Sequence, residues 1–170
     1  MRASEIQTAR LILRPLTAAD AAAVHSLWVS PGVRRYLWDD EVIPLEQAAA
    51  AVEESLALFE SSGCGLWGVR LNGDDELAGF CGYWHFHEPP ELELLYGVSE
   101  TQWRKGLATE MAEAMIRYGF DGLGFERIQA STDAANLASI RVMEKAGMRF
   151  LKREITGGLD TVYYVVNRNS

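Results

Sequence analysis

The sequence contains only two cysteines, Cys64 and Cys81, and both stand inside apolar segments. Cysteines in such settings usually behave as small buried hydrophobic residues, so a framework of disulfides is not expected. Three histidines are scattered along the chain and show no metal-ligand spacing with the cysteines. We therefore expect neither structural disulfides nor a bound metal.

Long apolar runs are absent as well. No stretch approaches the roughly 18 residues that a membrane-spanning helix needs, and the opening "MRASEIQTAR" lacks the apolar centre of a signal peptide. The expected location is cytoplasmic, without membrane attachment.

Positive charge is in short supply, because 16 Lys and Arg face 24 Asp and Glu and leave a formal net charge of −8. A general nucleic-acid binder needs a dominant basic face, so that class is excluded. The acidic balance mildly favours a cationic partner. A length of 170 residues suits a single globular domain, which we expect to span residues 1–170.

Local patterns predict a strand at 10–16, a helix opened by a Thr17–Asp20 capping box, and a stop at residues 30–32. An irregular segment at 33–43 should precede a second helix at 45–62, which Gly63 ends. Strands then follow at 65–71, 77–86 and 91–98, with Asn72-Gly73 as a hairpin turn.

From Gly106 the apolar period becomes helical, and a further strand is expected at 125–133. Asn136 should cap a fourth helix that Gly147 terminates, and a hairpin around Gly157-Gly158 closes the chain. The order indicates one α/β domain with a mixed sheet.

The stretch "QWRKGLATE", residues 102–110, is the candidate anion-binding segment of the sequence. Backbone N–H groups at the start of a helix have no intrahelical partner and bind anions. Gly106 would allow close approach of a phosphate, Ala108 keeps the turn thin, Thr109 offers a hydroxyl, and Arg104 and Lys105 add charge. Taken alone, the glycine could simply separate a strand from a helix. Neither a Rossmann nor a Walker pattern is present.

Together with "NLASIRVMEKAGM" downstream, this stretch resembles the GCN5-related N-acetyltransferase (GNAT) superfamily, and "WRKGLATE" is similar to its RimJ/RimL-like subgroup. The resemblance implies an α/β fold with a mixed, mostly antiparallel sheet of about seven strands, flanked by four helices and splayed between the fourth and fifth strands. It also implies acetyl-coenzyme A (acetyl-CoA) as co-substrate. Its binding residues would be Gly97, Val98, Trp103, Arg104, Lys105, Gly106, Leu107, Ala108, Thr109 and Asn136.

The implied reaction is direct transfer of an acetyl group to a primary amine in a ternary complex. Glu93 of "ELELLYGV" falls on the family's glutamate position and is the expected base, because a mostly protonated amine must lose a proton. Two alternatives stay open. Glu91 and Glu93 could both lie on a solvated face, or His85 or His87 could take the role of the base.

The family often protonates the departing thiolate with a tyrosine, but Met143 stands at that position and a thioether donates no proton. We expect Ser139 to serve instead, although its hydroxyl could equally bond back to the helix. Cys81 is disfavoured as a nucleophile because an apolar setting raises a thiol pKa.

The acceptor is expected near "RRYLWDDE", where Tyr36 and Trp38 with three acidic residues could form a mouth for a cationic amine, joined by Trp84 and His85. The same run could be an ordinary solvated loop with one anchoring tryptophan. The acceptor could be a protein α-amine or a small-molecule amine. A non-catalytic acyl-CoA sensor is the rival function, and a homodimer is compatible with the sequence.

Overall fold

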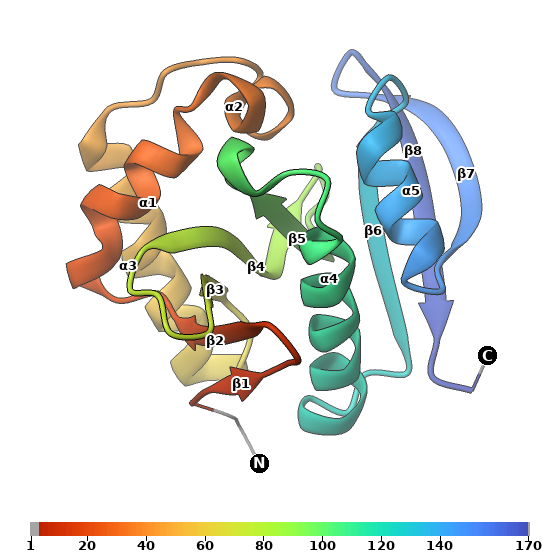
Figure 1. Cartoon of the computed structure of the whole chain (residues 1–170). Coiled ribbons are helices and arrows are strands. Elements are labelled where there is room, and N and C mark those ends of the chain that lie inside the picture. The colour runs from red at the N-terminus through yellow and green to blue at the C-terminus, as the bar shows by residue number, and fades with distance from the viewer. Residues whose placement is uncertain (1–3, 170) are drawn as a thin grey trace.

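The computed structural model describes residues 4–169 and places them in two antiparallel sheets that lie side by side (Figure 1). The first sheet has the strand order β1-β2-β3-β4-β5 and the second has the order β6-β8-β7. The strands are β1 (Ile6–Gln7), β2 (Leu11–Pro15), β3 (Leu66–Leu71), β4 (Leu77–Phe86), β5 (Glu91–Val98), β6 (Arg127–Asp133), β7 (Arg149–Thr156) and β8 (Leu159–Asn167). The helices are α1 (Ala21–Trp28), α2 (Pro31–Leu37), α3 (Leu45–Ser62), α4 (Leu107–Arg117) and α5 (Leu137–Lys145).

The two sheets meet at β5 and β6, which are neighbours without forming a ladder (Figure 1). β5 pairs with β4, and β6 pairs with β8. Side chains bridge the gap instead, since Gln129 and Ser131 of β6 reach Glu93 of β5. The predicted α/β fold and its splay are confirmed, but the expectation of a mixed sheet was wrong. Because β5 and β6 form no ladder, all the pairings between the described strands are antiparallel.

Each face of the five-stranded sheet buries its own hydrophobic cluster. The cluster on the α4 face contains Tyr83 together with Met111 and Met115 of α4, both fully buried. The cluster on the face of α1 and α3 contains Trp28 and Phe80, and Trp84 packs against it. Because successive strand residues point to opposite faces, side chains along β4 and β5 are divided between two compartments.

The chain contains a short helix, α2, that the sequence interpretation missed. Residues 33–43 were expected to be irregular, but α2 runs through Leu37. Ser30 precedes the helix with extended backbone, and Pro31 occupies its first position, where the missing N–H costs nothing. The prediction was wrong because the signals that stop α1 also start α2.

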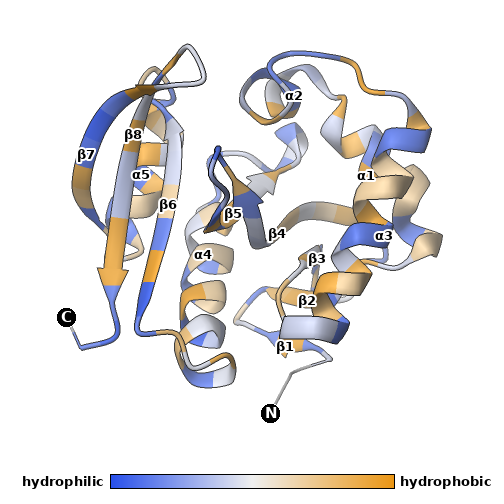
Figure 2. Cartoon of the chain, turned by 180° about the vertical axis from the view of Figure 1, so that it is seen from behind, coloured by the Kyte–Doolittle hydropathy of each residue, from blue (hydrophilic) through white to orange (hydrophobic). Residues whose placement is uncertain are grey.

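Other local signals act as expected. Gly63 ends α3 in the left-handed conformation at φ 76°. The N–H of Thr17 donates to Asp20 Oδ2 over 2.8 Å and closes the predicted capping box. β7, the outer strand of the three-stranded sheet, is exposed for nearly its whole length, and Figure 2 shows hydrophilic segments along it. Within residues 4–169, no helix combines the length and the hydropathy needed to span a membrane.

Candidate active site

The amino end of α4 lies at the seam between the two sheets (Figure 1). Gly106 precedes the helix in the left-handed conformation at φ 79°, and a Cβ built on it would meet only Arg10 Nη2, at 3.5 Å. The N–H of Glu110 donates to the Gly106 carbonyl over 3.2 Å, which closes the first helical turn. The N–H groups of residues 107–109 come before that bond, so they have no intrahelical acceptor, as at helix ends that bind anions.

The side chains of this loop are arranged to leave those N–H groups accessible. Leu107 is buried in the core, so only its backbone is available to a ligand. Ala108 and Thr109 are half-buried, whereas Arg104 and Lys105 are exposed. Arg104 holds a positive φ of 64°, which is strained for a residue other than glycine. The loop therefore presents cationic side chains around an unobstructed helix end, which fits a diphosphate.

Trp103, whose contact with acetyl-CoA stays a prediction, makes structural contacts within the protein. Its indole N–H donates to the Val98 carbonyl over 2.8 Å. Its ring covers Gly32 of α2, where an added Cβ would lie 2.4 Å from Trp103 Cη2. Glu100 Oε1 accepts the Gly32 N–H at 2.6 Å. These contacts hold the loop against α2.

Gly97 and Val98 end β5 beside the splay, and the ladder of β5 is formed with β4 alone. The predicted binding of acetyl-CoA by Gly97 and Val98 at this edge stays a prediction. Asn136 caps α5, because its Oδ1 accepts the Ser139 N–H at 3.3 Å while its Nδ2 donates to Thr132 Oγ1 at 3.1 Å. The expected cap is confirmed, and contact with a cofactor remains untested.

Glu93 is one of the most deeply buried side chains, with 1% of its surface exposed. Its Oε1 accepts from Ser131 Oγ at 2.5 Å and lies 3.1 Å from His87 Nε2, and its Oε2 accepts from Gln129 Nε2 at 2.7 Å. A solvated face is thus excluded for Glu93, although it holds for the exposed Glu91. A carboxylate with both oxygens held in this way has a fixed direction, as a base requires.

His87, and not His85, accompanies this carboxylate. The imidazole of His87 is 17% exposed and also lies 3.2 Å from Ser131 Oγ. His85 is exposed on β4 and has the same strand parity as Tyr83, so it lies on the face opposite Trp84. The structure therefore does not bring His85 to the other predicted acceptor residues. Donor atoms of His87, Glu91 and Glu93 lie within 4.8 Å of one another, a cluster that sequence spacing did not reveal.

Ser139 contacts Tyr96, a residue that the sequence interpretation did not select. The Tyr96 hydroxyl donates to the Ser139 carbonyl at 2.9 Å and lies 2.9 Å from Ser139 Oγ. Burial raises the pKa of Tyr96 to about 12, with the Ser139 hydrogen bond opposing the shift. Met143, at the family's tyrosine position, is buried in the core. Tyr96 therefore supplies a phenol that stays protonated at neutral pH.

Of the predicted acceptor residues, Trp38 and Trp84 pack against the same hydrophobic cluster. Trp38 packs on Trp28 with ring centroids 5.6 Å apart, and both Trp38 and Trp84 lie against the α1 and α3 cluster. The guanidinium carbon of Arg35 lies over the ring of Tyr36, 5.2 Å from the centroid of that ring. Glu93 has the same strand parity as Leu95, which packs in that cluster, so the carboxylate and Trp84 share one face.

Neither cysteine is placed to act as a nucleophile. Cys64 and Cys81 are both buried. Burial raises the pKa of the Cys81 thiol far above its ordinary value, which removes the reactive thiolate.

Comparison with known proteins agrees with this geometry. The profile of the acetyltransferase (GNAT) domain family matches residues 10–149. The chain belongs to this family. YoaA, an N-acetyltransferase of Bacillus subtilis (strain 168), is 31% identical over 145 residues, which cover 85% of this chain and 82% of that protein. This GNAT chain is accordingly an N-acetyltransferase.

Two solved structures share the fold of this GNAT chain. RimL, a ribosomal L7/L12 α-N-protein acetyltransferase in complex with coenzyme A, has a TM-score of 0.81 at 17% identity, with 96% of this chain and 97% of that one covered. AAC(6')-Ib in complex with ribostamycin and coenzyme A has a TM-score of 0.78 at 20% identity, with 94% of each chain covered. At these identities the likeness concerns the fold alone.

Residues 129 and 131 are the site residues that sequence reasoning could have found. Because Ile128 and Ala130 alternate toward the core, Gln129 and Ser131 must point to the other face. Which carboxylate they meet there depends on the packing of β5 beside β6.

Proposed function

We propose that this enzyme transfers an acetyl group from acetyl-CoA to a primary amine by direct attack, with Glu93 as the general base. The observation that carries the proposal is the buried, directionally held Glu93 carboxylate on the face of Trp84. The anion-binding end of α4 supports the cofactor assignment. The N–H groups of residues 107–109 would hold the diphosphate, and Arg104 and Lys105 would balance its charge.

The two proposed proton-transfer groups lie on opposite faces of β5. Glu93 faces the compartment of α1 and α3, whereas Tyr96 packs in the α4 cluster and bonds to α5. The amine enters on the first side, and the thioester lies on the second side beside the free edge of β5. The amine nitrogen forms a bond to the thioester carbon while its proton passes to Glu93, and the carbon–sulfur bond then breaks.

His87 receives the proton that Glu93 takes from the amine. Since Glu93 is almost wholly enclosed, a proton that it accepts needs a route to solvent, and the partly exposed His87 lies 3.1 Å away. On the other side, the Ser139 hydroxyl protonates the departing thiolate. The Tyr96 hydroxyl, which lies 2.9 Å from Ser139 Oγ, turns from the Ser139 carbonyl to pass its proton to that oxygen, and a proton from solvent then restores the phenol.

The acceptor side is acidic, which favours a cationic amine. Burial raises the pKa of Asp133, and the neighbouring charge of Asp39 adds to the shift. A second ammonium group on the acceptor would relieve this repulsion. Either an N-terminal α-amine of a protein, as the RimJ/RimL-like subgroup would use, or a small polyamine fits this chemistry.

The proposal is tested by measuring release of free thiol from acetyl-CoA with basic peptides, polyamines and aminoglycosides as acceptors. Wild type is compared with Glu93→Gln, Ser139→Ala and the exposed-carboxylate control Glu91→Gln. We expect turnover with one acceptor class, slowed about 10²- to 10⁴-fold by Glu93→Gln and left nearly intact by Glu91→Gln. Binding of coenzyme A without turnover by any amine would instead favour the acyl-CoA sensor.

A further inference from the structure

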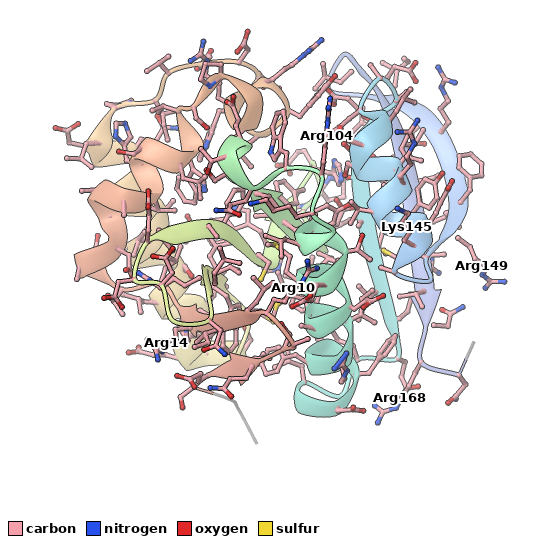
Figure 3. All side chains as sticks on the ribbon, in the orientation of Figure 1. Arg10, Arg14, Arg104, Lys145, Arg149 and Arg168 are labelled. Atoms are coloured by element: carbon pink, nitrogen blue, oxygen red, sulfur yellow. The ribbon has the colours of Figure 1, made fainter. Side chains whose placement is uncertain are left out.

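Arg10, just ahead of β2, lies beside α4 and reaches the loop that opens this helix (Figure 3). Its Nη1 donates to the Lys105 carbonyl at 2.7 Å. Its Nε donates to Glu110 Oε1 at 2.8 Å, and its backbone N–H donates to Glu110 Oε2 at 3.0 Å. Thr8 Oγ1 adds a further bond to Glu110 Oε2 at 2.5 Å. The N-terminal segment thus holds the loop at two points.

The bond to Lys105 fixes the orientation of the next amide. In a trans peptide the carbonyl and the N–H point in opposite directions. Anchoring the Lys105 carbonyl on Arg10 therefore turns the Gly106 N–H to the other side of the loop, adding it to the free donors of residues 107–109. Gly106 itself has the left-handed conformation that continues this turn into α4.

The hydrogen bonds from Arg10 to Glu110 balance the negative charge of this carboxylate. Glu110 lies in the first turn of α4, where a carboxylate interacts favourably with the helix dipole but repels an incoming anion. Burial alone would raise the pKa of Glu110, yet the hydrogen bonds from Thr8 and Arg10 outweigh burial and lower it. The carboxylate is consequently charged at neutral pH, and Arg10 is its counter-charge.

We propose that Arg10 is a positioning residue of the cofactor loop, which orients the Gly106 amide and neutralises Glu110 so that the start of α4 accepts the diphosphate of coenzyme A. Arg10 acts through the loop rather than as a catalytic group. The proposal concerns cofactor binding alone and does not depend on the roles of Glu93 or Ser139.

Titration calorimetry with coenzyme A and with dephospho-coenzyme A provides the test, on wild type, Arg10→Met, Arg10→Lys and the control Arg14→Met. Arg14 follows on the same segment but pairs with Glu5 away from α4 (Figure 3). Arg10→Met should raise both dissociation constants about tenfold, the loss of one charge-assisted hydrogen bond. Arg14→Met should match wild type, and Arg10→Lys should fall between them because lysine keeps the charge without the forked geometry.

The double variant Arg10→Met with Glu110→Gln separates the two roles of Arg10, which are to neutralise Glu110 and to anchor the Lys105 carbonyl. It should bind coenzyme A more tightly than Arg10→Met alone, because the uncompensated carboxylate is gone. A double variant as weak as the single one would overturn the electrostatic role. Weakening confined to coenzyme A, with dephospho-coenzyme A unaffected, would place Arg10 at the 3′-phosphate and overturn the proposal. Melting temperatures of all variants identify any loss of binding that comes from unfolding.

Discussion

Replacing Gly106 by alanine separates the structural and ligand-binding demands on the cofactor loop. Gly106 and Gly124 hold nearly the same left-handed conformation, at φ 79° and φ 75°. A methyl group at Gly106 would meet only Arg10 Nη2 at 3.5 Å, and at Gly124 it would meet nothing within 4 Å. Both substitutions are therefore free of steric overlap, and Gly106, unlike Gly124, adjoins the amino end of α4, where we propose that the diphosphate binds.

The size of the effect follows from backbone strain. A left-handed residue with a Cβ costs about 1–2 kcal/mol, and the restricted unfolded chain of alanine offsets about 0.4–1 kcal/mol of this. The net loss of about 1 kcal/mol should lower the melting temperature by about 2–4 °C in a protein of this length, equally at both sites. The strained alanine at position 106 would in addition rotate the donors of the loop.

Differential scanning fluorimetry and coenzyme A titration, run on Gly106→Ala and Gly124→Ala, check this reasoning. Equal losses of stability are expected, with a coenzyme A dissociation constant about tenfold higher for Gly106→Ala alone. If Gly106→Ala bound coenzyme A as tightly as Gly124→Ala, the left-handed residue would have no part in holding the diphosphate.

Three further outcomes are expected. Tyr96→Phe removes the phenol behind Ser139, so kcat should fall by about tenfold or more while coenzyme A affinity stays near wild type; an unchanged kcat would exclude Tyr96 from proton transfer. Cys81→Ala should keep turnover, because burial holds that thiol protonated; lost activity with a normal melting temperature would point to a covalent route. The lowered pKa of Glu110 adds stability that is present above its ordinary pKa of about 4.3 and disappears as pH falls through the folded value. Urea unfolding should accordingly show the advantage of wild type over Glu110→Gln shrinking in acid, and a gap that is constant with pH would contradict this.

Several features of this protein follow from the sequence by itself, because they depend on neighbours along the chain. Helical periodicity marked α4, and the position of Gly106 before it predicted an anion-binding helix end. Asn136 was recognised as a cap from its place before an apolar helix. The failure at α2 is also local, since Ser30 and Pro31 suit the end of one helix and the start of the next equally well.

The surroundings of the site residues were decided only by tertiary structure. Glu93 and Glu91 have the same strand parity, yet the packing of β6 buries Glu93 against Ser131 and leaves Glu91 exposed. His87 joins that carboxylate, and Arg10 joins a glutamate 100 residues away. Such contacts depend on which segments the collapsed core brings together. Strand alternation fixes the face of each side chain, but it does not determine the partner that the face meets.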